Sequence, residues 1–271
     1  MERSSRREFR AAGSVAVGAA LAGCPGQSST GSIEVEPGTP PLSEWQEVSV
    51  GEQGSVDGGS VAVEQTGVLT AVFVNRGEYL GLRSHPRRQY LAFGLDGGGR
   101  VSPEAFRFEA GAQVDPLAPI ASATDPVAGD GFATDVVLPV PVGDHDDPQI
   151  AYPPAGVSWA VADGTASALG EKPRLALDGA TLTEAAGIPG ISFEVANEGP
   201  RRAGFRVLVA PAWREEAAAR PHGFGVPAGE TVEETVPLDS LADRDPSALE
   251  LVDGVAPGAG GARHVEVAER A

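Results

Sequence analysis

The residues best suited to metal chemistry lie together in one short acidic segment, Asp144-His145-Asp146-Asp147. Carboxylates are ligands for calcium and magnesium, and a histidine among them would also admit zinc or another transition metal. Three further aspartates could add oxygen ligands: Asp125, Asp130 and Asp135. The spacing does not match the twelve-residue calcium loop, which needs glycine at position six and glutamate at position twelve. We therefore expect a solvated loop and predict no metal or other cofactor; a metal held by this segment is the alternative.

A second unusual segment is the cluster of Arg83, His85, Arg87 and Arg88, because the rest of the chain is strongly acidic. Guanidinium groups gathered in this way can bind an anion, an acidic neighbouring protein or a lipid headgroup. The alternative is that the many surrounding carboxylates neutralise the cluster in ion pairs, on a loop that precedes a strand at residues 89–95. Both interpretations fit the sequence.

The residue combinations of the common catalytic machineries do not occur in the sequence. There is no Gly-X-Ser-X-Gly elbow, no His-Glu-X-X-His zinc motif and no Gly-X-X-X-X-Gly-Lys-Ser/Thr phosphate loop. The single cysteine, Cys24, excludes disulfides within the chain, and Met1 is the only methionine that a copper site could use. We therefore predict that the protein is not an enzyme, with a hydrolase built from dispersed histidines and carboxylates as a minor alternative.

The N-terminal segment has the features of an export signal in the correct order. Arg6, Arg7 and Phe9 form a twin-arginine pattern, and an apolar run of small residues follows at 11–22. This run is too short for a membrane-spanning helix, which needs about 20 residues. The sequence therefore predicts an exported protein, and a coincidental alanine-rich N-terminus is the alternative.

The segment Leu21-Ala22-Gly23-Cys24 resembles the lipobox of prokaryotic lipoproteins. The resemblance implies that Cys24 carries a lipid and becomes the mature N-terminus. We thus predict a signal peptide at residues 1–23 and a lipid anchor on the outer face of the cytoplasmic membrane, at the cell surface. Residues 24–43 are rich in Gly, Ser, Thr and Pro and would form a flexible tether.

The charge balance restricts the partners of the protein. Lysine and arginine total 20 against 38 aspartates and glutamates, so the formal net charge is −18, and Lys172 is the only lysine. Nucleic acid is excluded as a partner, because phosphate binding requires a basic surface. The acidity is compatible with a solvated face, with a cationic partner, or with adaptation to molar salt, where charges are screened within about 3 Å. We favour salt adaptation, because this composition resembles that of haloarchaeal proteins.

Short apolar alternations broken by Gly, Pro and Asp predict an all-β fold. In the first half, strands are expected at residues 61–63, 68–74, 90–95, 106–108, 136–142 and 157–161. In the second half, they are expected at residues 175–177, 191–195, 205–209, 232–236, 249–252 and 265–267. Helices would be short, at residues 211–220 and 238–243. Trp159 and Tyr90 lie within strand patterns, which favours core positions over a carbohydrate-binding platform.

This layout predicts two antiparallel β-sandwich domains, residues 44–165 and 173–271, with a linker near residues 166–173. Residues 205–209 would return as the hairpin partner of residues 191–195, across the turn Asn197-Glu198-Gly199. With this turn and the segment Pro227-Ala228-Gly229-Glu230-Thr231, the second domain resembles the cell-adhesion-related immunoglobulin-like domains of prokaryotic surface proteins. The whole chain resembles haloarchaeal surface lipoproteins, which implies a location and a fold class but no reaction.

We therefore expect a non-catalytic binding, adhesion or scaffold module of the cell envelope. Its partners would be the membrane, through the lipid, and an envelope protein. The alternative is a lipoprotein that captures a ligand or an ion for a transporter. Against this alternative, solute-capturing proteins are usually larger α/β chains with a cleft between two lobes.

Overall fold

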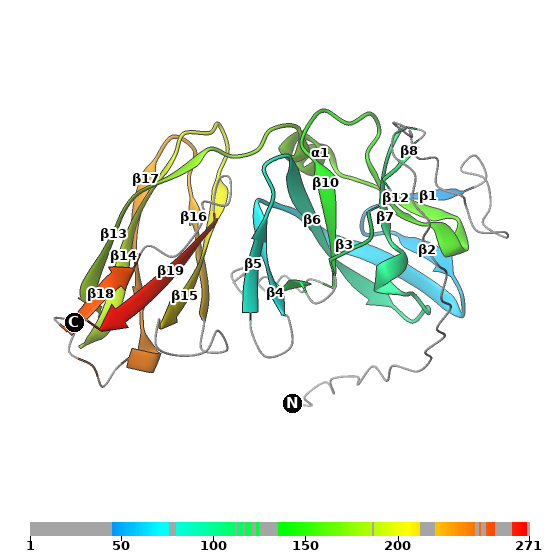
Figure 1. The fold of residues 1–271 in the computed structure, drawn as a ribbon. Coiled ribbons are helices and arrows are strands. Elements are labelled where there is room, and N and C mark those ends of the chain that lie inside the picture. The colour runs from blue at the N-terminus through cyan, green and yellow to red at the C-terminus, as the bar shows by residue number, and fades with distance from the viewer. Residues whose placement is uncertain are drawn as a thin grey trace, which may run out of the picture. The chain divides into compact units, whose positions relative to one another are not determined.

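The structure is a computed structural model that describes residues 45–75, 80–111, 113–115, 117–120, 123–124, 135–185, 187–211, 220–241, 244, 248–252 and 262–269 (Figure 1). The predicted signal peptide, Cys24 and the predicted tether lie outside these residues. No helix in the described part of the chain is long and apolar enough to cross a membrane. Nearly all regular structure is β-strand, which confirms the all-β sandwich class predicted from the sequence.

The described residues of the first half form three sheets. Sheet A has the order β1 (Gln46–Ser49), β12 (Val157–Ala160), β11 (Gln149–Tyr152), β7 (Arg107–Ala110) and β8 (Gln113–Val114). Sheet B has the order β10 (Val136–Pro141), β6 (Arg88–Gly97), β3 (Gly59–Leu69) and β2 (Gln53–Val56). Sheet C has the order β5 (Leu80–Ser84), β4 (Ala71–Asn75) and β9 (Ala123–Thr124).

The described residues of the second half form two sheets. Sheet D has the order β13 (Leu175–Ala185), β14 (Ile188–Asn197) and β17 (Thr231–Pro237). Sheet E has the order β16 (Arg220–Val226), β15 (Ala203–Pro211), β19 (Ala262–Glu269) and β18 (Leu249–Val252). Across both halves, the helical segments among the described residues are α1 (Asp163–Gly170) and the short 3-10 turns η2 (Pro103–Ala105), η3 (Pro153–Ala155) and η5 (Asp239–Leu241). Most strand pairs are antiparallel, whereas β1 with β12 and β15 with β19 are parallel.

Apolar side chains fill the layers between successive sheets. These layers include Phe93 and Trp159 between sheets A and B, Val72 and Tyr90 between B and C, Phe73 and Leu208 between C and E, and Phe193 and Phe205 between E and D. Burial of this apolar surface is the main favourable contribution to folding. Trp159 and Tyr90 are 0% and 1% exposed, which confirms that both are core residues.

Strand β6 is buried on both faces because it lies between two apolar layers. Leu91 and Phe93 point toward sheet A, whereas Tyr90 and Ala92 point toward sheet C. A strand covered on both sides has a continuous apolar sequence instead of an alternating one. The same reason applies to β4, in which residues 71–74 are all buried.

The predicted hairpin between residues 191–195 and 205–209 is wrong. Strand β14 pairs with β13 and β17 in sheet D, whereas β15 pairs with β16 and β19 in sheet E. The chain therefore crosses from one sheet to the other after Asn197. Asn197 is 1% exposed, and its Nδ2 donates hydrogen bonds to the carbonyls of Arg201 at 2.7 Å and Val226 at 3.0 Å. Its Oδ1 accepts the N–H of Gly199 at 3.0 Å, so all the bonds of this side chain hold the crossing.

The segment predicted as a linker begins within helix α1. Leu169 of this helix is fully buried in the core between sheets A and B. The Gln89 side chain donates to the carbonyls of Ala168 and Leu169, each at 3.1 Å. Arg201 donates to the carbonyls of Ser167, Ala168 and Glu171. The last carbonyls of α1 are thus bonded to side chains from sheet B and from the crossing after β14.

Two smaller predictions concern helices. Strand β15 ends at Pro211 and β16 begins at Arg220, and most of the helix predicted at residues 211–220 lies outside the described residues. Within the helix predicted at residues 238–243, the structure forms only the 3-10 turn η5. Both predicted domains belong to one compact unit, Val35–Ala271, and their division into two domains stays a prediction.

Candidate functional site

The predicted basic cluster forms the turn that connects sheet C to sheet B. His85 and Arg88 form an isolated antiparallel bridge between the end of β5 and the start of β6. His85 Nδ1 accepts a hydrogen bond from the Arg87 N–H at 3.1 Å, and the His85 carbonyl accepts one from the Arg88 N–H at 3.4 Å. The histidine therefore fixes the backbone of the turn that carries the arginines.

Lys172 joins this turn from a distant part of the sequence. Its Nζ donates a hydrogen bond to the His85 carbonyl at 2.7 Å. Burial lowers the pKa of Lys172, because removing an ammonium group from water penalises its charged form. Four basic side chains therefore belong to the basic turn: Arg83, Arg87, Arg88 and Lys172.

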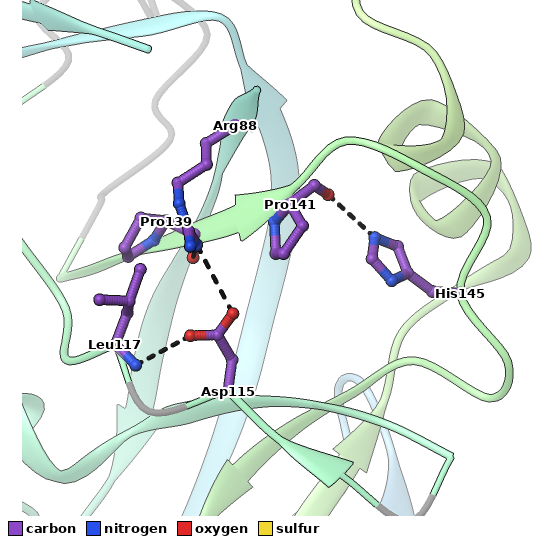
Figure 2. Close-up of polar contacts among 6 residues, drawn as sticks. All are labelled: Arg88, Asp115, Leu117, Pro139, Pro141 and His145. Atoms are coloured by element: carbon purple, nitrogen blue, oxygen red, sulfur yellow. Dashed lines mark hydrogen bonds and ion pairs between the residues drawn. The ribbon is translucent and has the colours of Figure 1, made fainter. Parts of the chain in front are cut away.

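Arg88 has an acidic partner that the sequence did not identify. Its Nη1 lies 3.5 Å from Asp115 Oδ2 and 3.5 Å from the Pro139 carbonyl (Figure 2). Asp115 Oδ1 accepts the N–H of Leu117 at 2.8 Å, which holds the carboxylate in place. The Arg88 side chain is 29% exposed, so solvent screens this pair and its contribution to stability is at most about 1 kcal/mol.

Arg83 and Arg87 differ from Arg88 in this respect. Both side chains are exposed, and neither has an ion-pair partner within the described part of the chain. Among the described residues, an ion pair that neutralises part of the cluster is therefore found for Arg88 and for neither of these two arginines. The basic turn therefore exposes two arginines without an ion pair to any described residue, in a chain whose net charge is −18.

The acidic segment at residues 144–147 has mainly structural contacts. His145 Nε2 donates to the Pro141 carbonyl at 3.0 Å (Figure 2), and its ring packs edge-on against Phe108 at 4.9 Å between centroids. The Asp146 carbonyl accepts the N–H of Gly111 at 2.6 Å. Asp147 has a φ of 43°, in the left-handed region that aspartate tolerates better than most residues.

Among the described residues, no group of three His, Cys, Asp or Glu side chains is placed to hold a metal ion. Asp135, which was considered as an additional ligand, instead accepts the N–H of Leu95 at 2.8 Å. Asp125 and Asp130 lie outside the described residues. The described part of this segment therefore offers no metal centre.

The remaining histidines lie in separate elements. His222 lies in β16 opposite Val207, and His264 lies in β19 opposite Leu208. Burial lowers the pKa of His222; Arg220 acts in the same direction and Asp239 in the opposite one. Trp213 and Tyr79 lie outside the described residues, and the Trp159 Nε1 is bonded to the Glu52 carbonyl at 3.1 Å. The buried aromatic residues are therefore unavailable as a platform for sugars.

Comparison with protein-family models, curated proteins and solved structures gives no match for this chain. The class of protein is therefore defined by the fold and the site alone. It is an all-β protein of stacked sheets that presents a basic turn on its surface. Two contributors to this turn, Lys172 and Asp115, were missed from the sequence because neither adjoins residues 83–88 in the chain.

Proposed function

We propose that this chain is a non-catalytic binding module of the cell envelope that docks to an acidic protein partner through the basic turn. The observation that carries the proposal is the exposure of Arg83 and Arg87 without an ionic partner in the described chain. The twin-arginine pattern of Arg6, Arg7 and Phe9 and the lipobox at Cys24 support export and lipid anchoring at the cell surface.

The charge distribution supports docking at this position. A surface with a net charge of −18 repels an acidic protein at contact distance over most of its area, even where molar salt screens charges beyond about 3 Å. A local cluster of guanidinium groups reverses this repulsion at one place and thereby orients the encounter. The contacts of His85 with Arg87, Arg88 and Lys172 hold the backbone of the turn in a fixed shape. Such preorganisation reduces the entropy lost on binding.

Crosslinking in intact cells at native salt, followed by mass spectrometry, tests this proposal. We expect the wild-type chain to capture an envelope protein reproducibly and a chain carrying Arg83→Glu and Arg87→Glu to lose it. The matched control is Arg100→Glu, an exposed arginine elsewhere in the first half of the chain, which should capture the same partner as wild type. Capture of that partner by the double variant would contradict docking through the basic turn.

Membrane fractionation tests the anchor in the same cells. Substitution of Cys24→Ser removes the thiol that would carry the lipid, so we expect the protein to leave the membrane fraction. Retention of this variant in the membrane fraction would contradict the lipid anchor without bearing on the basic turn.

A further inference from the structure

Two arginines from facing sheets lie at the same end of the layer between sheets B and C. Alternate residues of a strand share a face, so Arg88 lies on the same face of β6 as Tyr90 and Ala92, which pack in this layer. In β5, Arg83 is opposite Val72, which packs in the same layer. Arg83 and Arg88 therefore both belong to the faces that sheets B and C present to each other, next to the turn that joins them.

The Tyr90 residue packs in the same layer, and its hydroxyl forms no hydrogen bond with the described residues. Tyr90 is 1% exposed, and its Oη has no hydrogen-bond partner within the described part of the chain. A buried hydroxyl without a partner is energetically unfavourable. By contrast, the buried Tyr152 hydroxyl accepts the N–H of Ser102 at 3.1 Å. Packing alone would be satisfied by phenylalanine at position 90, so the hydroxyl group points to a use outside the fold.

The charges that act on this hydroxyl are those of the two arginines. Burial raises the pKa of Tyr90, and the guanidinium groups of Arg83 and Arg88 act in the opposite direction. The phenol remains protonated at neutral pH and is available as a hydrogen-bond donor. Arg83, Arg88 and the Tyr90 hydroxyl together offer several donors, of which only Arg88 has an acidic partner among the described residues, Asp115. Such a set of donors is the complement of an anion with several oxygen atoms.

The contact between Arg88 and Asp115 shows which kind of group this position accepts. A carboxylate oxygen already lies 3.5 Å from Arg88 Nη1, in a single contact. A tetrahedral anion with more oxygens can receive hydrogen bonds from both arginines, because a guanidinium group offers donors in a planar fork. The Asp115 carboxylate would then compete with the bound anion for Arg88.

We propose that Arg83, Arg88 and the Tyr90 hydroxyl bind a phosphate group, either as inorganic phosphate or as part of a lipid headgroup. This inference goes beyond the proposed function, because phosphate is a different ligand from the acidic protein that would dock at the same turn. Arg83 and Arg88 supply the charge-assisted bonds. Tyr90 supplies a third donor once the side chains that cover its buried hydroxyl move aside. Phosphate displaces the Asp115 carboxylate from Arg88 when it binds.

Calorimetric titration of the full chain with inorganic phosphate, at ionic strength held constant with chloride, tests the site. We expect Arg83→Gln and Tyr90→Phe each to weaken phosphate binding by about tenfold. Arg100→Gln is the matched control, since it removes the same charge from an exposed position outside the basic turn, and it should change the affinity by less than about twofold. Asp115→Asn keeps the acceptor for Leu117 but removes the competing charge, so binding should become tighter.

The Tyr90→Phe result separates binding from folding. Its hydroxyl makes no hydrogen bond in the described chain, so the variant should melt at the wild-type temperature or above it. Weaker phosphate binding by a fully folded variant supports the site. Unchanged affinity of Tyr90→Phe, or equal losses from Arg83→Gln and Arg100→Gln, would overturn the site and leave only an effect of net charge. Absence of phosphate binding by the wild-type chain would also overturn it.

Co-sedimentation with vesicles distinguishes the two sources of phosphate. The full chain carrying Cys24→Ser is mixed with phosphatidylglycerol or phosphatidylcholine vesicles, so that its own lipid makes no contribution. Binding to phosphatidylglycerol that is lost with Arg83→Gln supports the site and assigns it to headgroups. Phosphate binding without vesicle binding supports the site and assigns it to the free anion. If the site fails and the crosslinked partner still depends on Arg83 and Arg87, the proposed function stands without it.

Discussion

Two connections between sheets in this molecule use their polar side chains in opposite ways. At the crossing from β14 to β15, the Asn197 side chain is buried and forms three hydrogen bonds, to Gly199, Arg201 and Val226. At the turn from β5 to β6, Arg83 and Arg87 are exposed and have no ion-pair partner in the described chain. Both connections join one sheet to another. Only in the first do the bonds of the polar side chain stabilise the connection itself.

Whether a polar side chain is bonded within the protein therefore indicates its role, structural or functional, better than its residue type does. The acidic segment at residues 144–147 contains the residue types best suited to bind a metal. Its His145, however, is hydrogen-bonded to the Pro141 carbonyl and packs against Phe108. The basic turn contains ordinary surface residues, but two of its cations remain available to a partner. Polar groups satisfied inside the molecule stabilise it, and exposed charges without internal partners are free to bind.

The largest expected effect is at the crossing. Asn197→Ala leaves the buried carbonyls of Arg201 and Val226 without their donor, so we expect the free energy of unfolding to fall by about 2–4 kcal/mol. Asn197→Asp is the matched variant, because it keeps the acceptor for Gly199 and removes both donors. Urea denaturation measures both. A loss below about 1 kcal/mol in each variant would contradict the claim that the Asn197 side chain stabilises the crossing from β14 to β15.

A smaller effect is expected where Arg201 binds the end of helix α1. Its guanidinium donates to the carbonyls of Ala168 at 3.3 Å and Glu171 at 2.8 Å. Because Arg201 is partly exposed, we expect Arg201→Ala to lower the free energy of unfolding by only about 1 kcal/mol. Arg202→Ala is the control, with the same charge lost at an exposed neighbouring position. Equal losses in the two variants, measured by urea denaturation, would show a charge effect unrelated to the helix.

The sequence predicted the most buried strands but not β1, β2, β5, β11 and β16, and it predicted strand partners poorly. Apolar runs such as residues 71–74 and 90–93 mark strands because burial imposes their composition. Nothing local distinguishes a tight hairpin from a crossing between sheets, so the pairing of residues 191–195 with 205–209 was predicted wrongly. The deciding interaction joins Asn197 to Val226, which lies 29 residues further along the chain.

The candidate site was predictable only in part. Composition alone singled out residues 83–88, because basic residues are scarce in this chain. Lys172 lies 87 residues from His85 and reaches it only through the folded arrangement of helix α1 and β6. The sequence also contained no sign that the Tyr90 hydroxyl lacks a hydrogen-bond partner in the described chain, since a tyrosine in an apolar strand has the pattern of any core residue. Which polar groups lack partners is a property of the tertiary structure and leaves no mark in the local sequence.

The smallest expected effect concerns Glu109, a buried carboxyl group with one oxygen that has no partner in the described chain. Glu109 in β7 is 7% exposed, and its Oε2 has no partner in the described chain. Burial, with a smaller contribution from Glu47, raises the pKa of Glu109 above its usual 4.5. The raised pKa means that the associated stability is complete below pH 4.5 and is lost as the pH rises through the pKa of the folded state.

Glu109→Gln removes this ionisation and should therefore raise the free energy of unfolding at pH 7 by less than about 1 kcal/mol, with little change at pH 4. Denaturation with urea at both pH values measures the difference, and Glu47→Gln, at an exposed position, is the control and should give a smaller gain. Equal effects of Glu109→Gln at the two pH values would mean that the charge of Glu109 costs the fold nothing. A buried polar group without a partner would then carry no energetic cost. In that case, the unpartnered hydroxyl of Tyr90 would not indicate a ligand site.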